Sequence, residues 1–386
     1  MPLLQKNKRI IIASAIFLAL AFSLEAWIKE SRFKSQESIN LFEPQDLKSS
    51  EPLHRHPLTG LPALSQRPSD GLMPPGLPVY AVMIDNAVDA WPVSGIDKAF
   101  LVIEAPVEAA IPRLEAFFSS DTVVLKIGPV RSARPYFIDW ANEFDALYTH
   151  VGGSNAALEV ISSTGTFDIN EFWNGDYFWR ASDRYAPHNT YTSTELLGKY
   201  VEAAIDRDRA PEVLYGVWNF KDIQAEPSIG SPQESSDTNK YSLSDPAVAG
   251  ESKGQSSFVT VYFNSDLYTA NWTYDSESGQ YIRSQGGRPY LTADGTQVTA
   301  TNVAVIVTDI EILDYVGRRE IRTVGEGKAW LAQDGITIEA TWKKPSTSER
   351  LRFFDMTGNE ITMNAGNTWI EVVGDEEDVT VGIKSL

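Results

Sequence analysis

The 386-residue chain contains no cysteine. This absence excludes disulfide bonds, thiolate nucleophiles, Cys-ligated zinc and iron–sulfur clusters. It also excludes the lipid-bearing cysteine of a bacterial lipoprotein. A chain without cysteine is compatible with an oxidising compartment, although the absence alone does not establish one.

Histidine and the usual signatures of cofactor sites are scarce as well. The chain has four histidines, and none of them belongs to an HExxH pair or to another spacing typical of zinc ligands. The sequence contains no P-loop, no GxGxxG segment after a strand and no GxSxG segment. We therefore expect neither a metal site nor a bound cofactor.

Positive charge is also in short supply. Lys and Arg together number 33 against 52 Asp and Glu, which gives a formal net charge of -19. Because neutralising phosphate groups requires a basic face, this balance argues against nucleic acid as a partner. The acidic cluster at 374–379 is interpreted as a solvated tail.

Apolar side chains, by contrast, are abundant. Hydrophobic residues make up 42% of the chain, which includes 10 Trp, 15 Tyr and 17 Phe. This content is sufficient for packed cores, and the length allows two domains with additional tails.

The N-terminus has the pattern of an export signal. Three basic residues within the first nine precede an apolar run over 10–24, which extends to residue 28 across the lone Glu25. Such a pattern indicates a signal peptide or a signal anchor, and the extended run approaches the ~20 residues that span a bilayer. Because a good cleavage site is missing, we expect residues 1–28 to form an uncleaved anchor helix.

This anchor would make the protein a single-pass protein of the cell membrane with the bulk of the chain extracytoplasmic. Residues 29–78 are polar and then dense in proline. Such composition favours extended, semi-stiff conformations. We expect this segment to be a tether between the membrane and the folded part.

Between residues 79 and 220, short apolar runs typical of strands alternate with segments of helical spacing. Strands are predicted over 79–84, 99–103, 122–127 and 146–151. Helices are predicted over 132–144, 154–163 and 194–209. The alternation favours an N-terminal α/β domain with a mainly parallel or mixed sheet.

The texture changes after residue 220. Residues 221–256 are rich in Ser, Pro, Asp, Glu and Gly and are interpreted as a flexible linker. Beyond them, strands are predicted over 257–263, 268–274, 302–308, 329–331, 336–342, 351–354 and 368–373, separated by Gly- and Asn-containing turns. Residues 257–386 are therefore expected to form a second, mainly antiparallel β domain, so that the whole chain is of the α/β or α+β class.

Several segments in both halves resemble those of one protein family. In the N-terminal half they are 57–62 (PLTGLP), 83–86 (MIDN), 104–108 (EAPVE), 128–135 (GPVRSARP) and 178–192 (FWRASDRYAPHNTYT). In the C-terminal half they are 281–288, 302–303, 325–328, 334–335, 341–342, 354–355 and 366–369. The chain thereby resembles the DUF3048 family of YerB-like bacterial envelope proteins over residues 57–373.

The resemblance implies an exported, surface-anchored bacterial protein with two domains, and it implies little about mechanism. One feature departs from the family. Its YerB-type members are lipoproteins, whereas this chain has no cysteine and would have to use its apolar N-terminal helix as the anchor.

Two arginines of the 128–135 segment are candidates for binding an anion. Arg131 and Arg134 are three residues apart at the start of a predicted helix, with Ser132 between them. On a helix they would share a face, and the free N–H groups of a helix start already favour an anion. Two guanidinium groups could there bind a carboxylate or phosphate. The alternative is that they pair with nearby carboxylates and hold loops in place.

A second candidate segment contains Arg180, Asp183, Arg184, His188 and Asn189. Because His188 follows a proline, it is expected in a loop or an extended stretch. A histidine that acts as a general base needs a carboxylate to set its tautomer, and Asp183 is the nearest candidate. The alternative is a purely structural hydrogen-bond network.

Further candidates follow the predicted strands. Asp85 and Asn86 directly follow a strand, the usual place of site residues in an open sheet, although both residue types also form turns. His150 ends another strand before Gly152 and Gly153, where backbone can approach a ligand closely. As a solitary histidine, His150 is more often structural.

Two groups of residues suggest carbohydrate chemistry. Glu104 and Glu108 could serve as a carboxylate pair for glycan hydrolysis. Trp173, Phe178 and Trp179 lie beside the His188 segment. They are interpreted as core residues, and as a stacking surface for sugars if they are exposed.

Three functions therefore remain open. The first is a non-catalytic envelope protein that binds an anionic ligand, such as peptidoglycan or an envelope protein, through an Arg/His/Asp pocket. The second is a cell-wall hydrolase or transferase in which His188 is the base, Asp183 orients it, and Asp85 or Glu104 is the acid. The third is a scaffold in which every polar segment stabilises a loop.

Overall fold

The computed structural model describes residues 55–62, 77–207, 213, 215–222, 255–263 and 265–385. The predicted anchor over 1–28 lies outside these residues, as do most of the predicted tether and of the predicted linker over 221–256. Within the described part, no helix is long and apolar enough to cross a membrane.

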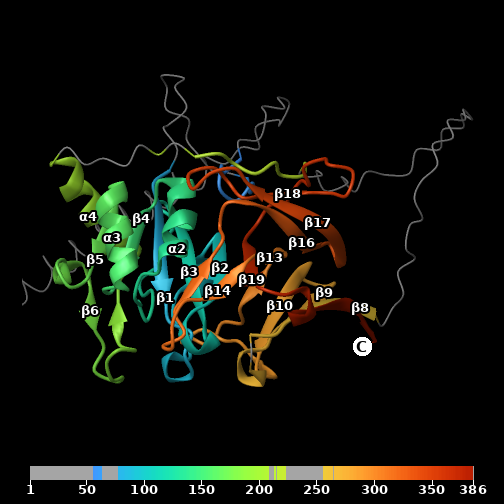
Figure 1. Ribbon diagram of the computed structural model, residues 1–386, viewed down its shortest axis with the longest axis horizontal. Helices are drawn as coiled ribbons and strands as arrows, with labels where there is room; N and C mark the ends of the chain where they lie inside the picture. The colour runs from blue at the N-terminus through green and yellow to red at the C-terminus, as the bar shows by residue number, and fades with distance from the viewer. Residues whose placement is uncertain are drawn as a thin grey trace, which may run out of the picture. The chain divides into compact units, whose positions relative to one another are not determined.

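Five strands of the N-terminal half form one side of a ten-stranded sheet (Figure 1). They are β1 (Val79–Ile84), β2 (Leu101–Pro106), β3 (Pro112–Ser119), β4 (Leu147–His150) and β5 (Asp168–Asn170). β3 pairs antiparallel with β1 and β2, whereas β4 is parallel to β1 and β5 is parallel to β4. The prediction of a mixed sheet is confirmed.

In this half, one predicted strand is absent and one observed strand was not predicted. Residues 122–127 form no strand, and the side chains of Val123 and Leu125 are 79% and 78% exposed. β3 was not predicted because Arg113 and Glu115 interrupt its apolar pattern, yet all eight of its residues are buried.

Three helices cover the two faces of this half. α2 (Pro135–Ala141) and α3 (Asn155–Thr164) pack into the hydrophobic core on one face, and α4 (Thr194–Ile205) packs into the core on the other. The hydroxyl of Ser154 accepts a hydrogen bond from the N–H of Ala157 at 3.2 Å, so the N-cap expected for α3 is present.

The C-terminal half supplies the other five strands of the same sheet. They are β13 (Asn302–Val307), β16 (Gly325–Gln333), β17 (Ile336–Lys344), β18 (Arg352–Phe354) and β19 (Thr368–Val373). β19 lies between β13 and β2 and is parallel to both. The two halves therefore share a core on each face of the sheet and belong to one compact unit, an arrangement that the segment-by-segment prediction did not contain.

A second, antiparallel sheet packs on one face of the first. It consists of β8 (Gln255–Val261), β9 (Ala270–Asp275), β10 (Gln280–Gln285), β11 (Arg288–Pro289), β12 (Thr299–Ala300) and β20 (Val379–Ser385). Its pairing confirms the antiparallel sheet predicted for this half. The acidic segment is exposed over residues 374–377, as expected, but it is not a tail, because the chain continues into β20.

The direction of the strands defines two sides of the large sheet. β13, β19, β2, β1, β4 and β5 all point the same way. We call the side where they end the carboxyl side, which is the lower end of Figure 1, and the opposite side the amino side. Two short hairpins, β6 (Trp179–Arg180) with β7 (Thr190–Tyr191) and β14 (Ile310–Ile312) with β15 (Arg319–Ile321), complete the fold.

Candidate functional site

Four of the predicted polar segments meet on the carboxyl side. They are 85–86, 128–135, 150–153 and 180–189. The backbone of Arg131 runs between the ends of β1 and β4: its N–H donates to the carbonyl of Met83 at 2.8 Å, and its carbonyl accepts from the N–H of Val151 at 3.0 Å. Residues that are far apart in the sequence therefore form one loop surface.

The centre of this surface is the carboxylate of Asp85, which directly follows β1 and is 5% exposed. Its Oδ2 lies 2.7 Å from Nδ1 of His188 and 3.1 Å from Nε of Arg131. Its Oδ1 accepts the N–H of Ala87 at 3.0 Å. One carboxylate thus orients an imidazole and a guanidinium from two different loops, and we call these three side chains the Asp85 cluster.

The Asp85 cluster keeps polar atoms that no described residue bonds. The side chains of His188 and Arg131 are 18% and 27% exposed. Within the described residues, neither Nε2 of His188 nor the terminal nitrogens of Arg131 have a hydrogen-bond partner. Because Nδ1 faces a carboxylate, a neutral ring carries its proton there and leaves Nε2 as an acceptor. A ligand could therefore meet an imidazole nitrogen and a guanidinium together.

The predicted role of Asp183 is wrong. Asp183 is exposed, and the carboxylate that orients His188 belongs to Asp85, which lies 103 positions away in the sequence. Nearness along the chain was misleading because the loop turns Asp183 towards solvent while it carries His188 back to the end of β1.

The predicted grip of one anion by Arg131 and Arg134 is also wrong. Arg134 is the extended N-cap residue of α2, with φ -134° and ψ 150°, so the two arginines precede the helix and do not share a helical face. The guanidinium of Arg134 binds Glu108 through two hydrogen bonds of 2.7 Å. Burial raises the pKa of Glu108, but these bonds and the charge of Arg134 outweigh it and hold the pKa below its ordinary value.

The other two arginines brace the loop that carries His188. Arg180 donates from Nε to Glu171 and from Nη1 to Asn189, both at 3.1 Å. Arg184 donates to the carbonyls of Ala90 and Pro92. Arg180, Arg184 and Asn189 therefore have structural contacts, which is the alternative that the sequence left open.

His150 is structural as well. It is fully buried, with Nδ1 2.7 Å from the carbonyl oxygen of Gly152 and Nε2 3.2 Å from Oδ2 of Asp168. Gly152 has φ +59°, and a Cβ there would lie 2.7 Å from the ring of Phe172. His150 and Gly152 therefore shape the turn after β4. The group that approaches the backbone of Gly152 closely is the ring of Phe172 and not a ligand.

Ser132 and Gly153 complete this part of the surface. The carbonyl of Ser132 accepts a hydrogen bond of 2.8 Å from the buried guanidinium of Arg113. A Cβ on Gly153 would lie 3.0 Å from the Cβ of Ala133. These contacts hold the 128–135 segment against the end of β4 and so position Arg131.

Asn86 and Glu104 belong to a second cluster, which is closed to solvent. Asn86 donates from Nδ2 to Glu104 at 3.1 Å. Glu104 and Glu371 accept from Nη2 and Nη1 of Arg283 at 2.7 and 2.8 Å, and all three side chains are 0% exposed. We call Glu104, Arg283 and Glu371 the Arg283 cluster. It joins β2 and β19 of the large sheet to β10 of the second sheet.

The Arg283 cluster removes Glu104 from the candidate catalytic residues. Burial raises the pKa of Glu104 well above its ordinary value, against the charge of Arg283. Since Glu104 has no access to solvent and Glu108 is paired with Arg134, the predicted carboxylate pair for glycan hydrolysis is wrong. Sequence reasoning missed Arg283 and Glu371; the signal for Glu371 was a charge within the apolar strand β19, whereas Arg283 lies in the polar sequence of β10 and gave no such signal.

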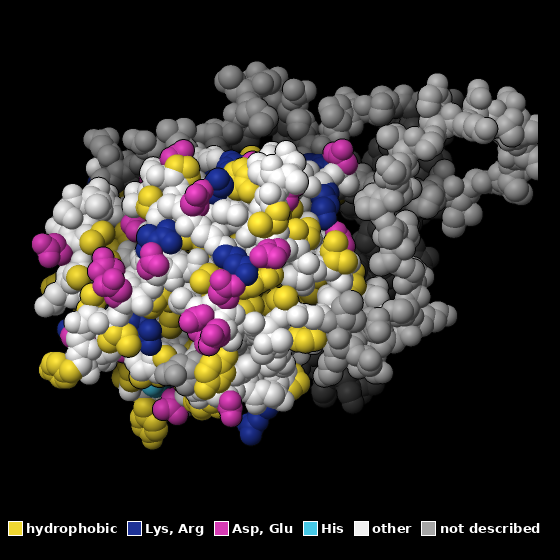
Figure 2. Space-filling model, turned by 45° about the vertical axis from the view of Figure 1, so that its right-hand side comes forward, with side chains coloured by type: hydrophobic (Ala, Val, Ile, Leu, Met, Phe, Trp, Pro, Cys, Tyr) yellow, Lys and Arg dark blue, Asp and Glu magenta, His cyan; other side chains and the backbone are white. Residues whose placement is uncertain are grey.

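Exposed aromatic side chains lie on the loops of this site. Tyr185, in the His188 loop, is 92% exposed, and Phe172 and Trp173, in the loop after β5, are 63% and 83% exposed. Figure 2 shows hydrophobic side chains that project from the lower end of the molecule, on the carboxyl side. Among the aromatics predicted as core or stacking residues, Phe178 is buried and Trp179 is 36% exposed.

Comparisons with known proteins extend over both halves of the chain. It matches the "Protein of unknown function (DUF3048) N-terminal domain" over residues 58–208 and the corresponding C-terminal domain over residues 259–370. It is 31% identical over 310 residues to the YerB protein of Bacillus subtilis (strain 168), whose name includes the word lipoprotein; the match covers 78% of this chain and 82% of YerB. The crystal structure of YerB from Bacillus subtilis superposes with a TM-score of 0.68 at 28% identity, over 85% of this chain and 99% of that one.

Proposed function

The chain belongs to the DUF3048 family, and from that premise we propose that it is a membrane-associated, extracytoplasmic protein of the bacterial envelope that binds an anionic cell-wall component. The word lipoprotein in the name of YerB supports the location. Since this chain has no cysteine, the proposal assigns the anchor to the apolar run over 10–24.

The location is tested by fractionation. We expect the full chain, expressed in a bacterial host, to sediment with the membranes, and a variant without residues 1–28 to lose that association. Protease added to intact spheroplasts should digest the full chain. Resistance of the full chain to protease, with a cytoplasmic marker intact, would contradict the extracytoplasmic location.

The observation that carries the ligand proposal is the pair of unused polar groups in the Asp85 cluster. The terminal nitrogens of Arg131 are donors only, and their planar arrangement matches a carboxylate or a phosphate. Asp85 and the backbone hold the guanidinium in place before any ligand arrives, which reduces the entropy lost on binding. His188 presents its free nitrogen from the adjacent loop.

The aromatic side chains on the same loops support a ligand that carries sugar rings. Tyr185 is in the His188 loop, and the ring of Phe172 lies against Gly152, next to Val151, whose N–H donates to the carbonyl of Arg131. Exposed aromatic rings next to a polar group are suited to stacking on the apolar faces of sugars. Peptidoglycan combines such rings with carboxylates, and we propose it as the ligand.

Calorimetric titration of the full chain with purified peptidoglycan fragments tests this function. Arg131→Gln should weaken binding about tenfold or more, because a charge-assisted hydrogen bond to the ligand is lost. Arg207→Gln is the matched control, since it removes the same charge from an exposed position at the end of α4. Equal affinities of the Arg131→Gln variant and the wild type would overturn the proposal.

A second candidate function, a cell-wall hydrolase or transferase, is favoured by one specific contact. The 2.7 Å distance between Asp85 and Nδ1 of His188 is the arrangement in which a carboxylate orients a catalytic imidazole, so that Nε2 can act as a base. The release of soluble fragments from peptidoglycan measures this activity. Loss of release with retained binding in a His188→Gln variant would establish it, and absence of release by the wild type would exclude it for this substrate.

A further inference from the structure

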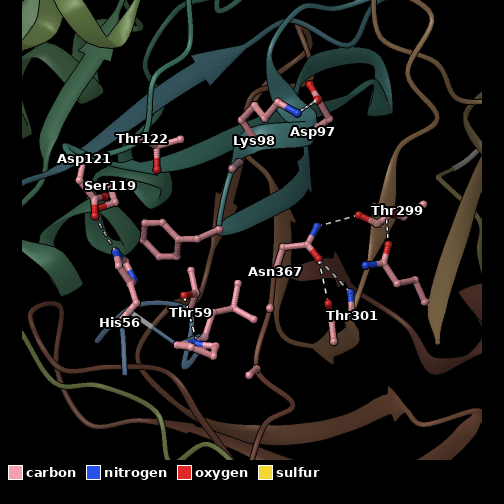
Figure 3. Close-up of a pocket in the computed structure, with 17 residues that line it drawn as sticks. His56, Thr59, Asp97, Lys98, Ser119, Asp121, Thr122, Thr299, Thr301 and Asn367 are labelled. Atoms are coloured by element: carbon pink, nitrogen blue, oxygen red, sulfur yellow. Dashed lines mark hydrogen bonds and ion pairs between the residues drawn. The ribbon is translucent and has the colours of Figure 1, made fainter. Parts of the chain in front are cut away.

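A cavity of about 780 Å³, drawn in Figure 3, is lined by residues of the amino side. The Asp85 cluster lies at the other end of the strands. Its lining includes Phe100 just before β2, Asn367 just before β19, and Ser119 at the end of the antiparallel strand β3. Both halves of the sequence therefore contribute walls. The volume falls within the range of about 300–1,000 Å³ that is typical of small-molecule sites.

One wall of the cavity is the 57–62 segment, which carries a family resemblance but plays no part in the Asp85 cluster. It forms a closed turn, in which the N–H of His56 donates to the carbonyl of Leu61 at 2.8 Å. The N–H of Gly366 donates to the carbonyl of Thr59 at 2.8 Å and ties this turn to the loop before β19. The wall is therefore built by contacts between the first described segment and the loop before β19.

A buried hydroxyl at another part of the lining has no partner among the described residues. Ser119 is 2% exposed and lines the cavity, and its Oγ makes no hydrogen bond to any described residue. Buried polar groups are almost always hydrogen-bonded, because an unpaired one is costly. Nε2 of Gln280 and the hydroxyl of Thr122, which also line the cavity, have no partner in the same part of the chain. These atoms could bond a polar ligand.

The charged groups of the cavity, in contrast, are already paired. Nζ of Lys98 lies 3.0 Å from the carboxylate of Asp97, and Nε2 of His56 lies 3.3 Å from that of Asp121 (Figure 3). What remains for a ligand are hydroxyl and amide groups, together with the apolar side chains of Leu61, Pro62, Ala99, Phe100 and Ala365. A ligand that fits this lining is uncharged, has many hydroxyl groups and also has an apolar face.

We propose that this amino-side cavity binds a neutral saccharide unit, held by hydrogen bonds from Ser119, Thr122 and Gln280. A sugar ring has hydroxyl groups on its edge and C–H groups on its faces, and so it matches the two kinds of lining. The proposal does not depend on the carboxyl-side function, because the two sites share no residue.

The test is titration of the full chain with three uncharged trisaccharides, namely chitotriose, maltotriose and cellotriose, with inorganic phosphate as the anionic comparison. We expect at least one trisaccharide to bind at millimolar concentrations or below and phosphate not to compete. Ser119→Ala should weaken binding about three- to tenfold, the effect of one net hydrogen bond. Its thermal stability should stay the same or rise, because the unpaired buried hydroxyl is gone.

Three other variants sharpen the test. Ser120→Ala is the matched control, since this neighbouring serine does not line the cavity, and it should bind as the wild type does. Ala365→Trp should abolish binding by filling the space. Arg131→Gln should bind the trisaccharide normally, so that failure of this proposal and failure of the carboxyl-side function are distinguishable.

Three outcomes would overturn the proposal. They are absence of binding for all three trisaccharides, binding that neither Ser119→Ala nor Ala365→Trp alters, and competition by phosphate. The last outcome would show that the cavity takes anions.

Discussion

Asp85 and Asn86 are neighbours in the sequence, yet their side chains belong to two ionic clusters with opposite relations to solvent. Asp85 reaches His188 and Arg131 at the surface. Asn86 reaches Glu104 in the interior. Successive side chains of an extended chain point to opposite faces, so the end of β1 supplies one residue to each cluster.

The Arg283 cluster presents no group to a ligand, because all three of its side chains are 0% exposed. Both terminal nitrogens of Arg283 are bonded to carboxylates, and its guanidinium lies 4.5–5.1 Å from the ring centroids of Trp272, Tyr290 and Trp369. The aromatic rings exclude water and stack on the planar cation. This cluster connects the two sheets and has a structural role.

The Asp85 cluster uses the same residue types differently. Its carboxylate is buried, but its imidazole and guanidinium reach solvent with nitrogens unbonded in the described chain. The comparison teaches that a buried carboxylate can either close a cluster or present cations to a ligand. Its role depends on whether the charged side chains that pair with it lie in the interior or reach the surface.

Of the substitutions in the two clusters, Arg283→Met should lower the free energy of unfolding most. This change leaves Glu104 and Glu371 buried without their cation, and the free energy of unfolding should fall by about 3–5 kcal/mol. Urea denaturation measures it, with Arg288→Gln, at an exposed arginine of β11, as the control. A loss below about 1 kcal/mol would show that Arg283 does not hold the sheets together.

A buried carboxyl group without an arginine sharpens the comparison. Glu115 in β3 is 0% exposed, and neither of its oxygens has a hydrogen-bond partner among the described residues. Burial raises its pKa well above the ordinary value, and the charges of Glu143 and Asp139 add to the increase. Glu115 can be buried in its neutral form, so its contribution to the free energy of unfolding is fully present below the ordinary pKa of about 4.3. That contribution is lost as the pH rises through the raised pKa.

Glu115→Gln should therefore raise the free energy of unfolding by about 1–3 kcal/mol at alkaline pH and flatten its decline with pH. Denaturation curves at several pH values measure this, with the exposed Glu277→Gln as the control. A Glu115→Gln variant that follows the wild-type pH dependence would contradict the assignment.

The smallest effect on stability is expected for Arg131→Gln. Its side chain is 27% exposed, and Asp85 keeps its bonds to His188 and Ala87. The loss should therefore stay below about 1 kcal/mol, whereas the affinity for an anionic ligand should fall about tenfold or more. A loss as large as that of Arg283→Met would make the Asp85 cluster structural and end the distinction between the two clusters.

Local patterns predicted individual elements well where the chemistry is local. β1 occupies the predicted residues because its apolar run ends at Asp85, and α3 follows Ser154 because that hydroxyl caps it. β3 was missed because its charged residues are buried by contacts that no local pattern shows. The same reason explains the wrong partner of His188, since Asp183 was chosen by distance along the chain.

The sequence by itself predicted most of the strands of the large sheet, the capped helix α3, the polar loops at strand ends and the absence of cysteine chemistry. Only the tertiary structure decided that strands of both halves join in one sheet and that Asp85 contacts His188. It also decided that the guanidinium of Arg283 is buried, whereas that of Arg131 reaches solvent. These features are hydrogen bonds and ion pairs between residues far apart in the chain. Their formation depends on strand order and packing, which the periodicity of a single segment does not encode.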